Sequence, residues 1–173
     1  IWILGSSKES AALAAAYGLP YAFAGHFAPR QMIQAFEFYR ENFQASAVLD
    51  KPKTMACVNI VAADTNEEAE FLSTSLYQMF LNLIRNDRKG LQPPVPSLDD
   101  IMGEEERFHV NQMTACTFTG NKEQLEIDLK KFINYARIDE LMVTSPIYDH
   151  QAKLKSIQIT KEVIDSLNES IHI

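Results

Sequence analysis

The stretch IWILGSSKESAALAAAYGLPYAFAGH, residues 1–26, carries the signals of a strand, a helix and a second strand in succession. The apolar run at 1–5 predicts a strand, and the Gly-Ser-Ser that ends it predicts a turn into a helix. Residues 9–17 are rich in alanine, the residue with the highest helix propensity. The Gly-Leu-Pro that follows ends the helix, and the alternating large and small side chains of 20–26 predict another strand. We therefore expect a β–α–β unit.

Strand and helix signals continue to alternate in the middle of the chain. Pro29 is expected to open a helix that reaches about Phe43, because proline suits the first turn of a helix. The nearly continuous apolar run at 54–62 is typical of a buried parallel strand. A second helix is expected to follow, capped by side chains of residues 64–66 and extending to about Arg88.

The last part of the chain contains a break and then two further strand signals. Three prolines and an acidic stretch predict an irregular excursion on the surface near 90–116. Thr117–Gly120 is expected to be a short strand and turn, followed by an amphipathic helix over 122–137. A buried strand is predicted at 140–145, and the chain from about Asp149 is expected to be mostly helical.

Four principal strands, each followed by a helix, predict an α/β fold with a parallel sheet and outer helices. Four repeats fit two architectures, which are a small doubly wound domain and half of an eight-stranded (β/α)8 TIM barrel. The 173 residues suit one domain that spans 1–173. The sequence opens at Ile1 without a methionine and directly with an apolar strand, so we expect a fragment of a longer chain.

A half barrel would leave two sheet edges and one sheet face uncovered. Its inner face would include Val58, Ile60, Leu141 or Val143, depending on the register of the strands. Monomers rarely leave large apolar patches exposed. The half-barrel interpretation therefore predicts a homo-oligomer in which strand edges or inner faces meet across chains.

Composition argues against several classes of protein. The net charge of −7 and the lack of a basic cluster argue against a nucleic-acid binder. No apolar run approaches about 18 residues and no secretory signal is present, so we expect no membrane span and a cytoplasmic protein. Cys57 and Cys116 form no metal motif, so we expect buried thiols and no metal site. The lack of a Gly-x-Gly-x-x-Gly fingerprint leaves a dinucleotide site without support.

The turn between the first strand and the first helix is a candidate binding site. Gly5 permits a tight turn, Ser6 continues it, and Ser7 begins a helix whose unpaired N–H groups favour an anion such as phosphate. Ser10 lies three residues after Ser7, so both hydroxyls can reach the same helix turn, and Lys8 adds a positive charge. The alternative is that Ser7 is a helix cap and binds no ligand.

Residues 4–29 closely resemble a stretch of the luciferase-like flavin monooxygenases. The similarity continues in order along nearly the whole chain, and this order, more than any one motif, makes it specific. The matching segments are Leu4–Ser7, Ser10-Ala11, Ala14-Ala15, Gly18–Pro20, Tyr21–Ala24, His26-Phe27, Tyr39–Phe43, Val61–Thr65, Glu68-Ala69, Thr119-Gly120 and Asp139–Asp149.

The resemblance implies the C-terminal half of a (β/α)8 barrel that binds reduced flavin mononucleotide (FMN), supplied by a flavin reductase, at the carboxyl ends of its strands. It implies oxidation of a small organic substrate, such as an aldehyde, by O2 activated at the flavin. Ser7 and Ser10 align with hydroxyl positions that contact the flavin phosphate, and Gly5 and Ser6 would supply the turn and backbone. His26, at the end of a strand, would line the flavin or substrate pocket, or support it through a hydrogen bond.

The resemblance also implies that part of the site lies outside these residues. In the family, much of the surroundings of the flavin ring comes from the first four strands of the barrel, including a histidine implicated in handling the peroxide. No catalytic residue is assigned within 1–173, and this chain alone is expected to be inactive. The alternatives are a non-catalytic flavin-binding member of the same fold and a small doubly wound domain that binds a phosphorylated ligand.

Overall fold

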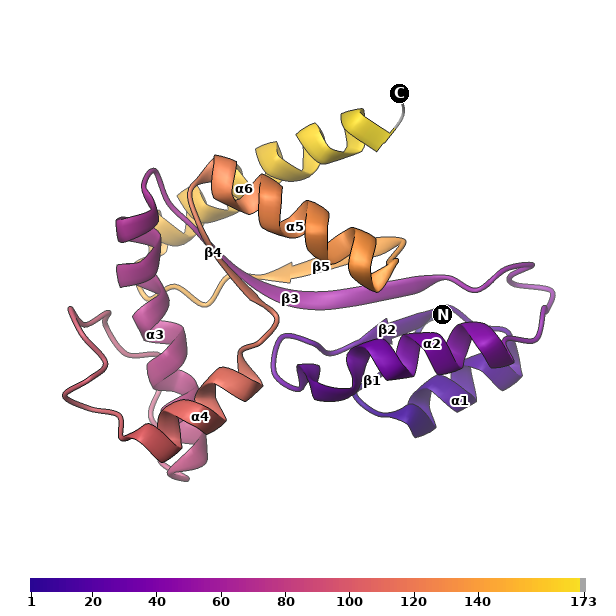
Figure 1. The fold of residues 1–173 in the computed structure, drawn as a ribbon, viewed down its shortest axis with the longest axis horizontal. Coiled ribbons are helices and arrows are strands. Elements are labelled where there is room, and N and C mark those ends of the chain that lie inside the picture. Colours follow the sequence, from indigo (N-terminus) through magenta and orange to yellow (C-terminus); the bar gives the residue numbers. More distant parts are fainter. Residues whose placement is uncertain (172–173) are drawn as a thin grey trace.

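The computed structural model describes residues 1–171 and contains one parallel sheet with helices packed around it (Figure 1). All four principal strands expected from the sequence are present, together with the short strand that begins at Thr117. In chain order the elements are β1 (Ile3–Gly5), α1 (Lys8–Tyr17), β2 (Tyr21–Phe23), the 3-10 turn η1 (Pro29–Gln31), α2 (Met32–Asn42), β3 (Thr54–Ala62), α3 (Asn66–Ile84), α4 (Glu104–Met113), β4 (Thr117–Gly120), α5 (Lys122–Ala136), β5 (Glu140–Thr144) and α6 (His150–Ile171).

The long strand β3 is the central strand of the sheet. β1 pairs with β2, and β2 pairs with residues 54–56 of β3. β4 pairs with residues 59–62 on the same edge of β3, while β5 pairs with residues 55–59 on the opposite edge. All of these pairings are parallel. β2 and β4 therefore share one edge of β3, and they leave a seam at residues 57–58 where neither strand is paired.

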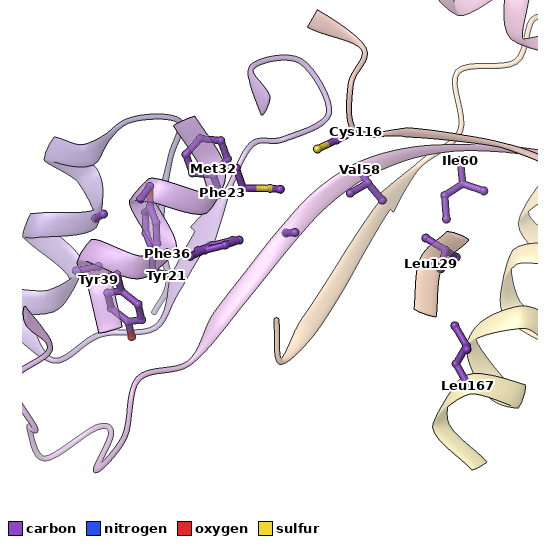
Figure 2. Close-up of a cluster of buried hydrophobic side chains, with 14 of the residues drawn as sticks. Tyr21, Phe23, Met32, Phe36, Tyr39, Val58, Ile60, Cys116, Leu129 and Leu167 are labelled. Atoms are coloured by element: carbon purple, nitrogen blue, oxygen red, sulfur yellow. The ribbon is translucent and has the colours of Figure 1, made fainter. Parts of the chain in front are cut away.

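Four helices cover one face of the sheet. Side chains of α1, α2, α5 and α6 pack against alternate residues of the strands in one apolar core, part of which is drawn in Figure 2. Tyr21 and Phe23 of β2 each meet Phe36 of α2 nearly edge-on, with ring centroids 6.0 Å apart in both pairs. On β3, Val58 and Ile60 point into the same core and are fully buried.

The register of the strands decides which side chains face away from the helices. Val58 and Ile60, considered for the inner face of a half barrel, lie instead on the helix-covered face. Leu141 and Val143 of β5 also pack against that core. Because side chains alternate along a strand, the inner face takes the intervening residues of β3 and β5. None of the four residues named from the sequence therefore belongs to the inner face.

Within residues 1–171, a helix covers the inner face of the sheet only near the carboxyl end of β3, where Val61 packs against Ala69 and Leu72 of α3. On the rest of this face, Leu4 of β1 and Met142 of β5 are 68% and 51% exposed. A doubly wound domain carries helices on both faces of its sheet, so that alternative does not fit. The chain has the arrangement of a half barrel, with helices outside and an open inner face between two edge strands, β1 and β5.

α3 and α4 lie together beyond the carboxyl end of β3 (Figure 1). Leu76 and Phe80 of α3 pack against Met102 and Val110 in a small core of their own. The excursion near 90–116 is therefore not irregular throughout, because its last part forms α4. Three acidic residues in the first turn of α4 favour the helix electrostatically, and the packing of Val110 fixes it against α3.

α3 ends at Ile84, short of the expected end near Arg88. The chain turns there because Asn86 adopts the left-handed conformation, with φ of 55°. The guanidinium of Arg85 donates to both oxygens of the Glu106 carboxylate, at 2.6 and 2.7 Å, and to the backbone oxygen of Ile101 at 2.8 Å. These bonds tie the end of α3 to the start of α4 and close the base of the excursion.

Replacing Phe36 by alanine is expected to lower the free energy of unfolding by about 3–5 kcal/mol, because its fully buried ring would leave a cavity. The control is Leu13→Ala on α1, where the side chain is 48% exposed, and a change within about 0.5 kcal/mol is expected. Urea unfolding followed by circular dichroism measures both. Equal losses in the two variants would contradict the placement of the core.

Candidate functional site

The carboxyl ends of the parallel strands meet at one edge of the sheet, which is the functional face of β/α barrels. Two features lie along this edge. One is the turn from β1 into α1, where Gly5, Ser6 and Ser7 are followed by Ser10 in the first turn of α1. The other is a pocket beyond β2, β3 and β5, which contains His26. The structure thus places the five predicted site residues at the same edge but in two separate groups.

Gly5 is required by a close approach within the first turn. A Cβ atom at this position would lie 2.1 Å from the Ser10 hydroxyl oxygen and 2.3 Å from the Ser10 Cβ. Its backbone is not in the left-handed region, so the need for glycine is one of space. The absence of a side chain at Gly5 allows Ser10 to pack directly beneath the end of β1.

Ser10 is turned into the protein and is already occupied. Its hydroxyl donates to the backbone oxygen of Ser7 at 2.7 Å and lies 3.0 Å from the hydroxyl of Tyr21. The Tyr21 hydroxyl also donates to the Ser7 oxygen, at 3.0 Å. Burial raises the pKa of Tyr21, so its hydroxyl stays protonated as a donor. Ser10 therefore supports the turn from within, and in this arrangement its hydroxyl is not free for a ligand.

Ser7 is the residue of this group that remains available to an anion. It stands at the N-cap of α1, and its hydroxyl makes no capping bond to the helix backbone. The nearby Ser7 hydroxyl and the Glu9 amide lower the pKa of the Glu9 carboxylate. The Lys8 ammonium instead lies 4.5 Å above the ring of Phe38, on the side toward α2.

A phosphate group fits these donors only in part. The Ser7 hydroxyl and the first-turn amides of α1 could hold it, since those amides have no partner within the helix. The Ser7 hydroxyl and the Glu9 amide favour the charged form of the Glu9 carboxylate, so the start of α1 favours negative charge. The Ser10 hydroxyl is bonded within the turn in this arrangement, and its expected part in holding the phosphate stays a prediction.

The pocket has a volume of about 750 Å³, within the usual range for small-molecule sites. It lies between the carboxyl ends of β2, β3 and β5 and the C-terminal half of α3, which closes one side. Asp87, Arg88 and Lys89, in the turn after α3, stand along it, and Lys89 pairs with Asp87 at 2.6 Å. The apolar part of its lining consists of Phe27, Met79, Phe80, Leu83 and Pro146.

His26, which was expected to line a flavin or substrate pocket or to support it, lies in the wall of this pocket. Its ring meets the ring of Phe27 nearly edge-on, with centroids 4.8 Å apart. Desolvation lowers the pKa of His26 below its ordinary value, which favours the neutral imidazole near neutral pH. The site therefore offers an uncharged ring at its wall.

Asn59 is a component of the site that the sequence interpretation missed. It lies within the apolar run of β3 and is only 2% exposed. Its amide donates to the backbone oxygen of His26 at 2.6 Å and to the Thr117 hydroxyl at 3.3 Å, and its oxygen accepts from the Thr144 hydroxyl at 2.7 Å. An asparagine inside a buried apolar run was the signal that could have revealed it, because a buried amide needs hydrogen-bond partners.

Within residues 1–171, no group of three or more His, Cys, Asp and Glu side chains is placed to hold a metal ion. Cys57 and Cys116 are buried free thiols, and burial raises the pKa of Cys116 to about 11. No described helix has the length and apolar character needed to span a membrane.

A family model described as luciferase-like monooxygenase matches residues 1–125, well over half of the chain. A luciferase-like monooxygenase of Escherichia coli (strain K12) is 43% identical over 167 residues, which are 96% of this chain and 50% of that protein. The chain thus spans about half the length of this curated relative.

Solved structures show the same fold. The structure of apo-MsnO8 superimposes with a TM-score of 0.76 at 24% identity, over 95% of this chain and 50% of that one. A riboflavin lyase, RcaE, solved with modified FMN and riboflavin, has a TM-score of 0.56 at 16% identity, over 98% of this chain and 42% of its own. From the family match and the sequence identity, this chain belongs to the luciferase-like monooxygenase family.

Proposed function

We propose that this chain is the part of an FMN-dependent monooxygenase that holds the flavin phosphate and forms one wall of the flavin and substrate pocket. The observation that carries the proposal is the position of the α1 N-terminus and the 750 Å³ pocket at one edge of the sheet. FMN in the riboflavin lyase of the same fold supports this choice of cofactor. The cofactor would be reduced FMN from a separate flavin reductase, and the protein would work in the cytoplasm.

The residues of this chain would divide the task of holding the cofactor. Ser7 and the first-turn amides of α1 would bind the phosphate, while Gly5, Ser6 and Ser10 keep the turn in shape. Reduced flavin, when bound, supplies the electrons for activation of O2. The apolar wall of the pocket would exclude water and receive a small organic substrate such as an aldehyde.

The chain alone is proposed not to turn over. Its sheet has an open inner face, and the pocket is walled by β2, β3, β5 and α3 on one side. Oxygen chemistry at a flavin needs groups preorganised around the ring, and the curated relative in the family is about twice as long as this chain. The complete site is therefore proposed to need residues outside the 173.

Ser7→Ala is expected to weaken FMN binding by about 1–3 kcal/mol, or roughly 5- to 150-fold, through loss of a hydrogen bond to a charged group. Riboflavin lacks the phosphate, so its affinity should not change. Quenching of flavin fluorescence measures both ligands.

Ser10→Ala is the comparison variant for this experiment. Because the Ser10 hydroxyl bonds to the Ser7 oxygen and approaches Tyr21, its loss should act through the shape of the turn. Any weakening should then be smaller than that in Ser7→Ala. Unchanged FMN affinity in Ser7→Ala would show that the Ser7 hydroxyl does not bind the phosphate.

The open sheet is also proposed to associate with a second copy. β1 and β5 each have an unpaired edge in the described residues, and Leu4 and Met142 expose apolar surface between these edges. Two half barrels that meet at their edges or inner faces would satisfy the backbone groups and cover this surface.

Sedimentation velocity is expected to show concentration-dependent association of the 173-residue chain. The double variant Leu4→Lys with Met142→Lys should shift the association equilibrium to monomer, because the two lysines place two charges on the inner face. Leu13→Lys, at an exposed site on the helix-covered side, should associate like the unmodified chain. A stable monomer at micromolar concentration, with a cooperative melting transition, would contradict the association.

A further inference from the structure

The two ring nitrogens of His26 have different surroundings. Nδ1 is shielded from solvent and has no hydrogen-bond partner among the described residues. Nε2 is not enclosed in this way, and the ring lines the pocket. The histidine at the pocket wall therefore has one accessible nitrogen, Nε2, and one isolated nitrogen, Nδ1.

This asymmetry selects one form of the imidazole. A neutral ring carries its proton on one nitrogen and leaves the other as an acceptor. A buried N–H without an acceptor is rarer in proteins than a buried acceptor without a donor. The proton is therefore favoured on Nε2, and the doubly protonated cation is disfavoured because it would also need an N–H at Nδ1. The lowered pKa of His26 agrees with this.

Asn59 fixes the backbone that carries this ring. Its Nδ2 donates to the His26 carbonyl oxygen at 2.6 Å, the shortest of its bonds. The amide itself is held by Thr144 and Thr117, on the strands that flank β3. A side chain buried to 98% and bonded on three sides cannot easily reorient, so the loop after β2 is held in register with the sheet.

We propose that Asn59 is a positioning residue that holds His26 as a neutral imidazole, with Nε2–H presented to the pocket as a donor to a carbonyl oxygen of the bound ligand. Identification of that ligand as a flavin rests on the proposed function. The protonation form of the His26 imidazole and its dependence on Asn59 do not rest on the proposed function. A ligand with a carbonyl acceptor is therefore favoured over one that offers only donors at this wall.

The charges near His26 are few. Asp87, Arg88 and Lys89 face the pocket from the turn after α3, and Asp87 and Lys89 pair with each other. Arg30 follows on the same loop as His26. The pocket-lining residues of α3, β3 and β5 are uncharged. Desolvation is accordingly the cause of the lowered pKa.

Nitrogen-detected NMR of the ligand-free chain tests the positioning. His26, assigned with a His26→Asn variant, is expected to carry its neutral-state proton on Nε2 and to titrate below about 6.5, the ordinary imidazole value. Asn59→Ala should move the pKa up toward that value, because the freed loop lets water reach the ring. Thr144→Val, which removes a bond to Asn59 and is milder, should shift it in the same direction.

Ser145→Ala is the matched control for these variants. It removes a buried hydroxyl directly after β5, which donates to the Ile60 oxygen and has no hydrogen bond with Asn59. The His26 pKa should be unchanged in it. A neutral-state proton on Nδ1, or an equal pKa shift in Ser145→Ala, would overturn the proposal whether or not the chain binds flavin.

Riboflavin titrations test the donor itself, since riboflavin has ring carbonyls and no phosphate that titrates near neutral pH. His26→Leu should weaken binding about 3- to 10-fold, as expected for one lost neutral hydrogen bond. His26→Gln, whose side-chain amide can donate near the Nε2 position, should bind within about twofold of the unmodified chain. The measurement is made at about pH 8, where the imidazole is neutral.

Equal riboflavin affinity in the Leu and Gln variants would overturn the donor assignment. If the unmodified chain fails to bind riboflavin, the carbonyl ligand is wrong together with the proposed function. The NMR measurement still decides the positioning by Asn59 in that case, so the two failures are distinguishable.

Discussion

The buried amide of Asn59 is the interaction on which the functional edge of the sheet depends. β3 is paired by β2 along its first part and by β4 along its last part, with a break between them on the same edge. At this break the Asn59 side chain bonds to the loop after β2 and to β4, and across the opposite edge to β5. One amide thus joins three neighbours of β3 where backbone pairing alone leaves a seam.

The distribution of helices has a second consequence. α1, α2, α5 and α6 share a single core on one face, while α3 and α4 build a small core of their own beyond the strands. The strands are therefore packed mainly from one side, and α3 lies over the carboxyl end of β3, where it packs against Val61. This asymmetry gives the half barrel an apolar pocket at the carboxyl edge of its strands, which is the functional face of β/α barrels, and it leaves most of the inner face open.

How much of the fold can be predicted from the sequence depends on whether the contacts that form each element are local or long-range. Local signals placed every principal strand, because runs such as 54–62 and turns such as Gly18–Pro20 depend on neighbours in the chain. The register between distant strands could not be predicted from local signals. The expectation that Val58 and Ile60 face the inside of the barrel was therefore wrong, because both lie on the helix-covered face. α4 was missed because its stability comes partly from packing of Val110 against α3.

The candidate site was predicted in outline but not in its contacts. The turn at Ser7 follows from a local motif, and so does the strand before His26, although β2 ends at Phe23 and His26 lies in the loop after it. The inward position of the Ser10 side chain on α1 depends on its contact with Tyr21, which lies eleven residues later on β2. The part played by Asn59 depends on strands far apart in the sequence. Such contacts arise from tertiary structure and leave no periodic pattern.

The most direct test of the account is a crystal structure of the 173-residue chain with FMN bound. The account predicts the phosphate at the start of α1, within hydrogen-bond distance of the Ser7 hydroxyl, and the flavin ring in the pocket beside His26. A phosphate bound away from α1, or a flavin ring outside the pocket, would contradict it.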